Sequence, residues 1–327
     1  MNPSINPIDQ VLQQVKIAQA MSHEGLTSYP LIRDTLFAKD YLTLDEALTN
    51  QTAVITEVSE GGSVPQLLLR NMGEQAVFLL DGEELTGAKQ NRILNISILA
   101  PGMKDTVIPV SCVEAGRWRH SSPDFSAAPR AQFSASRAKR SAHVSEDICQ
   151  TGQRRSNQGE VWDDISAKLN SLGSQSDTQA VESAFMDHEQ QLNAFVEKLQ
   201  PAENQFGAVF AVKGRITGLE LFDSQDTCRA LMPKIIRSYA LDAIDPGLRG
   251  SAAANSPSAD SFLLQVRKSA IHAAQAVGEG TDLRFDNASG VAGGALQARD
   301  RIVHLVAFAI SAPAHHGSDR VYRRRSY

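Results

Sequence analysis

Residues 53–113 contain five short apolar segments: AVITEV (53–58), VPQLLL (64–69), AVFLL (76–80), ILNISIL (93–99) and VIPVSCV (107–113). They are separated by the turn-forming residues Gly61-Gly62, Asn71-Met72-Gly73, Asp81-Gly82 and Pro101-Gly102. The segments are rich in β-branched residues and recur about every 10–14 residues. This pattern is typical of strands joined by tight turns. The sequence therefore predicts an antiparallel sheet or sandwich in the N-terminal half of the chain.

The rest of the chain predicts packed helices and further hairpins. Residues 42–48 should form a short helix capped by Thr43, with Glu46 at the spacing of a capping box. Helical periodicity continues over 180–199, 226–244 and 259–277. Hairpins are expected between 207–212 and 215–222, and between 295–298 and 302–310. Because the strands occur in hairpin-like groups and do not alternate with helices, the predicted fold class is α+β.

These patterns divide the chain into three regions. Residues 1–26 are expected to be an N-terminal helical extension, in which 6–22 form one amphipathic helix. Residues 27–312 are expected to be a single large α+β domain, strand-rich over 27–120, helical and basic over 121–200, and mixed over 201–312. Residues 313–327 are expected to be a basic, flexible tail. The middle region contains Arg130, Arg137, Lys139, Arg140, Arg154 and Arg155, which either line a phosphate-binding surface or solvate a loop and a helix.

The charge, the apolar segments and the cysteines of the chain limit the classes of function that we expect. The 327 residues include 32 Lys and Arg against 37 Asp and Glu, a net charge of −5, so binding of nucleic acid by bulk charge is not expected. No segment approaches the roughly 18 apolar residues of a membrane span, and the first residues do not resemble a secretory signal. The three cysteines are far apart and predict reduced thiols. We expect a cytoplasmic protein without membrane association.

Several common catalytic and cofactor motifs are absent from the sequence. It contains no GxxxxGK[ST], no GxGxxG at a strand–helix junction, no HExxH and no GxSxG. The eight histidines are scattered, and His304 lies in an apolar segment typical of a hydrogen-bonded core histidine. We therefore predict neither an intrinsic metal site nor a bound cofactor.

The segment DGEELTGAKQNRILN (81–95) is unusually polar for its place between two apolar strands. In an extended conformation, one face would carry Glu83, Lys89 and Asn91, and the other Glu84, Gln90 and Arg92. Gly87 would allow the backbone to bend or to approach a ligand closely. The segment is either part of a ligand site or a solvated connection with a surface ion pair.

The segment IPVSCVEAGRWR (108–119) places Glu114 at the end of an apolar strand face. Such a position favours a raised pKa and therefore a general acid or base. Arg117 offers a planar fork for phosphate or carboxylate, and Trp118 a surface for stacking a base or sugar. The alternative is a core strand that ends in a salt bridge, with Trp118 packed inside and Cys112 a buried, unreactive thiol.

Together the two segments resemble the ARG and Rhodanese-Phosphatase-superfamily-associated Protein domain family. The resemblance depends on two ordered motifs and continues from about residue 29 to 308. The motif residues are Gly82-Glu83, Gly87, Lys89-Gln90, Arg92, Pro109, Cys112-Val113-Glu114 and Gly116-Arg117-Trp118. Further matching residues are Gly218-Leu219-Glu220-Leu221-Phe222, Ser238-Tyr239-Ala240 and the strand around His304. The resemblance implies an α+β domain of uncharacterised chemistry and, through the association with ADP-ribosylglycohydrolase-like proteins, a link to NAD or ADP-ribose metabolism.

These observations favour an enzyme, a hydrolase or transferase, that acts on a phosphorylated sugar or nucleotide derivative resembling ADP-ribose. In this hypothesis Glu83 and Glu114 form the carboxylate pair. Substrate would be bound by Lys89 with Arg92 or Arg117 at the phosphate, Gln90 and Asn91 at hydroxyls, and Trp118 by stacking. The alternative is a non-catalytic module that binds a nucleotide or a protein with the same residues. An enzyme needs these groups in one cleft.

Overall fold

The computed structural model describes residues 6–34, 37–59, 65–117, 122–248 and 258–310. Its largest sheet has nine strands in the order β1-β3-β13-β14-β18-β17-β16-β15, with β2 paired to β3. These strands are β1 (Lys16–Ile17), β2 (Met21–His23), β3 (Leu26–Ile32), β13 (Gln205–Val212), β14 (Arg215–Phe222), β15 (Ile271–Gln275), β16 (Thr281–Phe285), β17 (Val291–Ala298) and β18 (Arg301–Ala309). The N-terminal strands thus complete a sheet made mostly by the C-terminal part of the chain.

Two smaller sheets contain the other strands. A three-stranded sheet has the order β10-β7-β4, and a six-stranded sheet the order β12-β8-β9-β11-β6-β5. Their strands are β4 (Leu42–Thr43), β5 (Ala53–Glu57), β6 (Gln66–Asn71), β7 (Val77–Leu79), β8 (Glu83–Gly87), β9 (Arg92–Leu94), β10 (Ile98–Ala100), β11 (Lys104–Cys112) and β12 (Phe125–Ala131). All of the pairings between these strands are antiparallel except that of β4 with β7. The predicted α+β class is confirmed.

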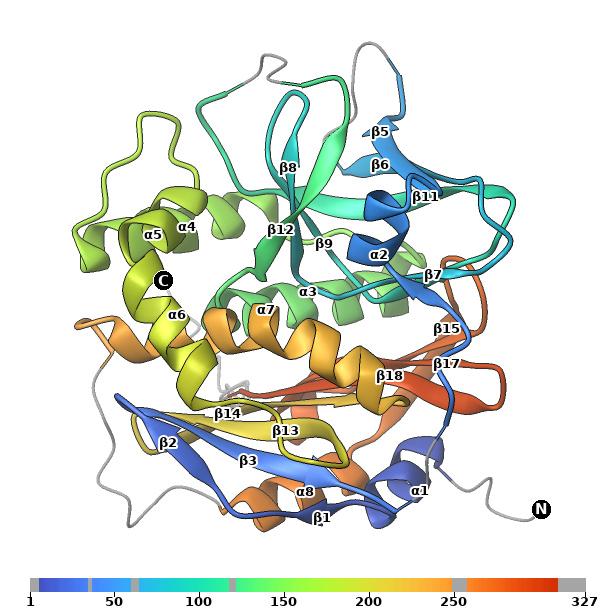
Figure 1. The fold of residues 1–327 in the computed structure, drawn as a ribbon, viewed down its shortest axis with the longest axis vertical. Coiled ribbons are helices and arrows are strands. Elements are labelled where there is room, and N and C mark those ends of the chain that lie inside the picture. Colours follow the sequence, from blue (N-terminus) through green and yellow to red (C-terminus); the bar gives the residue numbers. More distant parts are fainter. Residues whose placement is uncertain (1–5, 35–36, 60–64, 118–121, 249–257, 311–327) are drawn as a thin grey trace, which may run out of the picture.

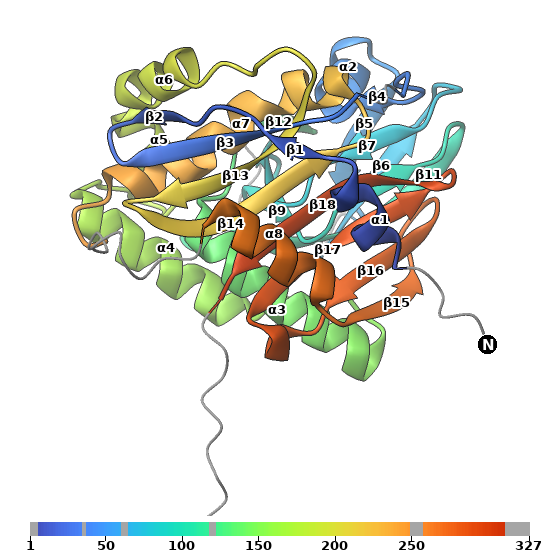
Figure 2. The same cartoon turned by 90° about the horizontal axis from the view of Figure 1, so that it is seen from below.

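The helices separate and cover the sheets. They are α1 (Pro7–Gln13), α2 (Leu44–Thr49), α3 (Ser134–Thr151), α4 (Gln158–Leu172), α5 (Glu182–Asp187), α6 (Glu189–Lys198), α7 (Gln225–Ile244), α8 (Ala259–Lys268) and the 3₁₀ helix η2 (Asn287–Ser289). Figure 1 shows α3 and α7 between the smaller sheets and the nine-stranded sheet. Figure 2 shows α1 and α8 in front of the nine-stranded sheet, and Figure 1 shows that this is the side away from the smaller sheets. No helix in the described part of the chain is long and apolar enough to span a membrane.

Three apolar clusters fill the spaces between these layers. The first joins α7 and α6 to the inner face of the nine-stranded sheet, as in the stacked pair Phe210 and Tyr239. The second packs α1 and α8 on the outer face of that sheet, and the third fills the space enclosed by the smaller sheets. The inner layer also contains many buried charged side chains, which are described below.

Several predicted elements have different boundaries in the structure. The helix predicted over 6–22 ends at Gln13, because residues 16–17 and 21–23 pair with β3. The helix predicted over 180–199 is interrupted at His188, which caps both α5 and α6. The helix predicted over 259–277 ends at Lys268, and 271–275 become β15. In the helices predicted over 6–22 and 259–277, pairing with a neighbouring strand overrides the local helical pattern. The tail at 313–327 lies outside the described residues.

The short helix α2 begins with the predicted capping box. Thr43 Oγ1 accepts a hydrogen bond from the Glu46 N–H, and Glu46 Oε2 accepts one from the Thr43 N–H at 2.7 Å. We expect Thr43→Ala to lower the free energy of unfolding by about 1 kcal/mol, because the helix loses one capping acceptor. Urea unfolding should show this loss, whereas Thr43→Ser should retain most of the stability. Equal unfolding midpoints for the alanine variant and the unmodified protein would contradict this role of Thr43.

Candidate functional site

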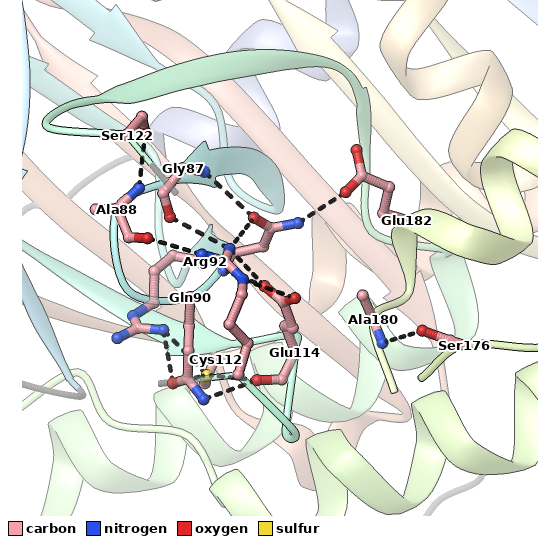
Figure 3. A network of polar contacts seen from close by, with 12 residues as sticks. Gly87, Ala88, Gln90, Arg92, Cys112, Glu114, Ser122, Ser176, Ala180 and Glu182 are labelled. Carbon is pink, nitrogen blue, oxygen red and sulfur yellow. Dashed lines mark hydrogen bonds and ion pairs between the residues drawn. The ribbon is translucent and has the colours of Figure 1, made fainter. Parts of the chain in front are cut away.

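The two polar segments singled out in the sequence lie side by side in the six-stranded sheet. Strand β9 pairs with β8 on one side and with β11 on the other, where Arg92 lies opposite Cys112. Beyond these pairs the Val113 N–H donates to the Asn91 carbonyl at 3.1 Å, and Gln90 Nε2 donates to the Glu114 carbonyl at 2.8 Å. The ends of both segments therefore meet (Figure 3).

Glu114 and Arg117 form a tight, mostly buried ion pair at this junction. Arg117 Nε donates to Glu114 Oε1 at 2.9 Å, and Arg117 Nη2 lies 2.7 Å from Glu114 Oε2. Burial opposes the charge on Glu114, but hydrogen bonds from Arg117 and from the Asn91 N–H outweigh it and lower the pKa of Glu114. The strand end therefore holds an ionised carboxylate, and the raised pKa favoured by the sequence is wrong.

Arg117 also holds the loop between β8 and β9. Its Nη1 donates to the Ala88 carbonyl at 2.7 Å, and its Nη2 donates to the Asn91 side-chain oxygen at 3.1 Å. Ser122 Oγ lies on the other side of this loop and accepts from the Ala88 N–H at 3.0 Å. Gly87 has a φ of +130°, and a Cβ there would lie 2.6 Å from Ser122 Oγ, so this turn requires glycine.

A second carboxylate, Glu182 at the start of α5, joins the site through Asn91. Asn91 Nδ2 donates to Glu182 Oε2 at 3.1 Å, while the Asn91 backbone N–H donates to Glu114 Oε2 at 3.1 Å. Arg130 Nη2 donates to the other oxygen of Glu182 at 2.8 Å, and Arg130 also pairs with buried Glu84. Asn91 thus bridges two carboxylates that are distant in the sequence. Nothing in the sequence connects Glu182 with the polar segments, since its partners come from the turn after β8 and from β12.

These groups surround an open, polar pocket of about 420 Å³, which we call the Asn91 pocket. It is lined by Thr86, Gly87, Asn91, Glu114, Arg117, Ser122, Ser126 and Glu182. The side chain of Glu182 is 35% exposed, whereas that of Glu114 is 6% exposed. The carboxylate most accessible to a ligand is therefore Glu182, with Glu114 behind it.

Cys112, Gln90 and Arg92 form a separate cluster behind the Asn91 pocket. The Cys112 thiol donates to Gln90 Oε1 at 2.7 Å, and Arg92 Nη1 lies 3.0 Å from both Cys112 Sγ and Gln90 Oε1. Burial raises the pKa of the Cys112 thiol even though Arg92 opposes this effect. The Arg92 side chain is fully buried, so it does not present its guanidinium to the Asn91 pocket.

The sequence hypothesis paired Glu83 with Glu114, but the structure gives Glu83 different partners. Glu83 Oε1 accepts from Lys234 Nζ at 2.5 Å, and Lys234 also pairs with Asp45 at 2.7 Å. Burial raises the pKa of Glu83, although Lys234 opposes this effect. Glu83 is not among the described residues that line the Asn91 pocket. The polar segment is also buried over most of its length, so a solvated connection is wrong.

Three arginines of the basic middle region are likewise buried. Arg130, Arg137 and Arg140 are 7%, 0% and 1% exposed. Arg140 Nη2 pairs with Asp81 Oδ1 at 2.8 Å, and Arg137 Nη1 with Glu220 Oε1 at 2.7 Å. These three side chains neither line an open phosphate-binding surface nor solvate a loop, because they neutralise carboxylates inside the protein.

A family model for the ARG and Rhodanese-Phosphatase-superfamily-associated Protein domain matches residues 14–308. The chain belongs to this family. The match begins before residue 29, where the resemblance was first expected, and it includes the strands β1 and β2 that replace part of the predicted N-terminal helix. No curated protein and no solved structure is detectably similar to the chain.

The candidate site residues named from the sequence have different positions relative to the Asn91 pocket. Asn91, Glu114 and Arg117 line the Asn91 pocket, and Gln90 and Arg92 lie behind it. Lys89 is partly exposed in the same turn, and Trp118 lies outside the described residues. Within the described ranges, no cluster of three or more His, Cys, Asp or Glu side chains is arranged to hold a metal ion.

Proposed function

We propose that the Asn91 pocket binds a phosphorylated sugar or nucleotide derivative, of the kind of ADP-ribose, and that the protein hydrolyses or transfers it with two carboxylates. The observation that supports this proposal is the bridge formed by Asn91 between Glu114 and Glu182 at one open pocket. Paired carboxylates in different environments are the usual means of cleaving a glycosidic bond. The proposal retains Glu114 and replaces Glu83 by Glu182.

The two carboxylates have different roles in this proposal. Glu114 stays ionised beside Arg117 and stabilises positive charge that develops on the sugar. Glu182 is more exposed and transfers a proton to or from the leaving group or a water molecule. Asn91 fixes the separation of the two groups and presents its amide near substrate hydroxyls. Arg117 is a positioning residue, because its donors are directed at Glu114, Ala88 and Asn91.

The phosphate of the ligand requires a cation at the rim of the pocket. Lys89 is the candidate, because it is partly exposed in the turn that also carries Asn91. Arg92 is excluded from this role by its complete burial against Cys112 and Gln90. A phosphate at Lys89 would leave the sugar beside Asn91 and the two carboxylates.

The second candidate is a binding module without catalysis. It is favoured by the saturation of the charged groups: Glu114 is held by Arg117, and Glu182 is held by Arg130. Such a module would bind the same class of ligand through Lys89 and Asn91 and leave it unchanged. The two candidates differ in turnover and not in the place of binding.

The test combines a thermal-shift screen with product analysis. We expect ADP-ribose, NAD, AMP or a ribose phosphate to raise the melting temperature, since a ligand that binds only the folded state stabilises it by mass action. For a ligand that is also converted, Glu182→Gln should lower turnover by roughly 100-fold or more while the thermal shift remains. Chromatography of the reaction mixture measures the conversion.

The matched control is Glu203→Gln, a substitution of an exposed glutamate away from the pocket, which should change neither binding nor turnover. Binding without conversion that is lost in Lys89→Ala would support the module instead. If none of the ligands shifts the melting temperature, or if Glu182→Gln converts its ligand at the normal rate, the proposed enzyme is wrong.

A further inference from the structure

A chain of three hydrogen-bonded side chains crosses from the three-stranded sheet to the nine-stranded sheet. Ser97 immediately precedes β10, His304 lies in β18, and Glu220 lies in the adjacent strand β14. Ser97 Oγ lies 2.8 Å from His304 Nδ1, and His304 Nε2 lies 2.9 Å from Glu220 Oε2. None of the three is among the residues that line the Asn91 pocket.

The partners of His304 determine which of its nitrogens carries the proton. A carboxylate only accepts hydrogen bonds, so His304 Nε2 donates to Glu220. In the neutral imidazole Nδ1 is then an acceptor, and it takes the hydrogen bond of the Ser97 hydroxyl. Glu220 is itself held in place by Arg137 Nη1 at 2.7 Å. This order of donors and acceptors is the one that activates a nucleophilic serine.

Packing holds the imidazole in this orientation. The ring stacks on Phe222 with centroids 4.7 Å apart and meets the edge of Phe78 at 5.8 Å. His304 is 1% exposed and Glu220 is 0% exposed, whereas Ser97 is partly exposed. The Asp81 N–H also donates to Ser97 Oγ at 3.0 Å and fixes the hydroxyl. Ser97 is therefore the accessible member of the three hydrogen-bonded side chains. His304 and Glu220 lie behind it, and their orientations are fixed by packing and by hydrogen bonds.

We propose that Ser97 is the nucleophile of a second centre in this protein, which cleaves uncharged carboxylic esters. His304 is its general base and acid, and Glu220 is a positioning residue. The two carboxylates behind the serine, Asp81 and Glu220, are balanced by Arg137 and Arg140. Among the described residues these two carboxylates and two arginines cancel, so they supply no excess positive charge that would select a phosphate.

The reaction proceeds in two balanced steps. Ser97 Oγ attacks the ester carbonyl carbon while its proton moves to His304 Nδ1, and the bond from that carbon to the alcohol oxygen then breaks as the alcohol takes this proton. Water next attacks the acyl-serine and gives a proton to His304 Nδ1. The carboxylic acid leaves, and the proton returns to Ser97 Oγ.

The first experiment treats the full chain with diisopropyl fluorophosphate and maps adducts by mass spectrometry. We expect one adduct, on Ser97, that is absent in Ser97→Ala. Hydrolysis of 4-nitrophenyl acetate should fall to background in the same variant, while ligand binding in the Asn91 pocket is unchanged. The internal control is Ser111, whose hydroxyl bonds to Asn95 and Ser156 among the described residues, and which should stay unmodified. Absence of an adduct on Ser97 in the folded protein would overturn the proposal.

The second experiment does not depend on a variant of the buried histidine. In Ser97→Cys the new thiol gives its proton to His304, so iodoacetamide should alkylate position 97 roughly tenfold faster at neutral pH than it alkylates Cys149. Cys149 is exposed and serves as the reference within the same molecule. Slower alkylation of position 97 than of Cys149 would show that the serine has an ordinary structural role.

Discussion

Arg137→Met is expected to lower the free energy of unfolding by about 3–5 kcal/mol, because it leaves buried Glu220 without its cation and leaves Asp81 with Arg140 alone. The Arg137 guanidinium lies 2.7 Å from Glu220 Oε1 and 3.6 Å from Asp81 Oδ1, and all three side chains are almost fully buried. Burial opposes the charge on Arg137, but Glu220 and Asp81 outweigh it and raise the pKa of Arg137. Methionine fills similar space, so the loss measures charge more than packing.

Urea unfolding of two further variants tests whether the loss of stability comes from the buried charge of Arg137 or from any substitution of an arginine in a helix. Arg229→Met changes an exposed arginine of α7, with 62% of its side chain accessible, and should leave the unfolding midpoint unchanged. Arg137→Lys keeps the charge and loses the planar fork, so its stability should lie between those of the unmodified protein and Arg137→Met. Equal stability of Arg137→Met and the unmodified protein would show that the buried carboxylates do not need this arginine.

Glu114→Gln is expected to cost about 2 kcal/mol at neutral pH, since Arg117 loses a charged, hydrogen-bonded partner. Burial favours the neutral form of Glu114, but the hydrogen bonds from Arg117 and the Asn91 N–H outweigh it, and the pKa of Glu114 in the folded protein is lowered. A carboxyl whose pKa is lower in the folded state than in the unfolded state stabilises the protein above its unfolded value of about 4.3. This stabilisation disappears as the pH falls through the folded pKa.

The difference in stability between the unmodified protein and Glu114→Gln should therefore be full at pH 6 and shrink below a pH of about 4. Chemical unfolding at a series of pH values measures it. Asp105→Asn is the control, because Asp105 pairs with Arg70 at the surface, where both side chains are about half exposed, and its loss should change the free energy of unfolding little. A difference that stays constant from pH 6 to pH 3 would contradict the lowered pKa of Glu114.

The sequence predicted well those features that depend on neighbouring residues. The capping box at Thr43 and the hairpin turns at Lys213-Gly214 and Arg299-Asp300 are all present in the structure. Each is determined by turn or cap chemistry within a few residues. The membership of the family was also predicted from two local motifs.

Features that depend on distant partners were not predictable in the same way. Residues 16–17 and 21–23 have a helical pattern but pair with β3, and β12 lies in a region predicted to be helical. At the Asn91 pocket, Asn91 contacts Glu182, which is far away in the chain. At the proposed second centre, Ser97 likewise contacts the distant residue His304. The burial of Arg130, Arg137 and Arg140 follows from carboxylates supplied by other strands and turns, which composition alone does not place.

The pairing of β3 with β13 has a consequence for the synthesis of the protein. Leu26 lies opposite Val212, so β3 leaves the ribosome long before its partner strand has been made. At about 5–20 residues per second this interval lasts roughly 10–35 seconds. During that time β1 and β2, already made, can cover one edge of β3, while the edge that later pairs with β13 stays unpaired and open to aggregation. A nascent chain that stalls before residue 205 cannot complete the nine-stranded sheet, however well its smaller sheets have formed.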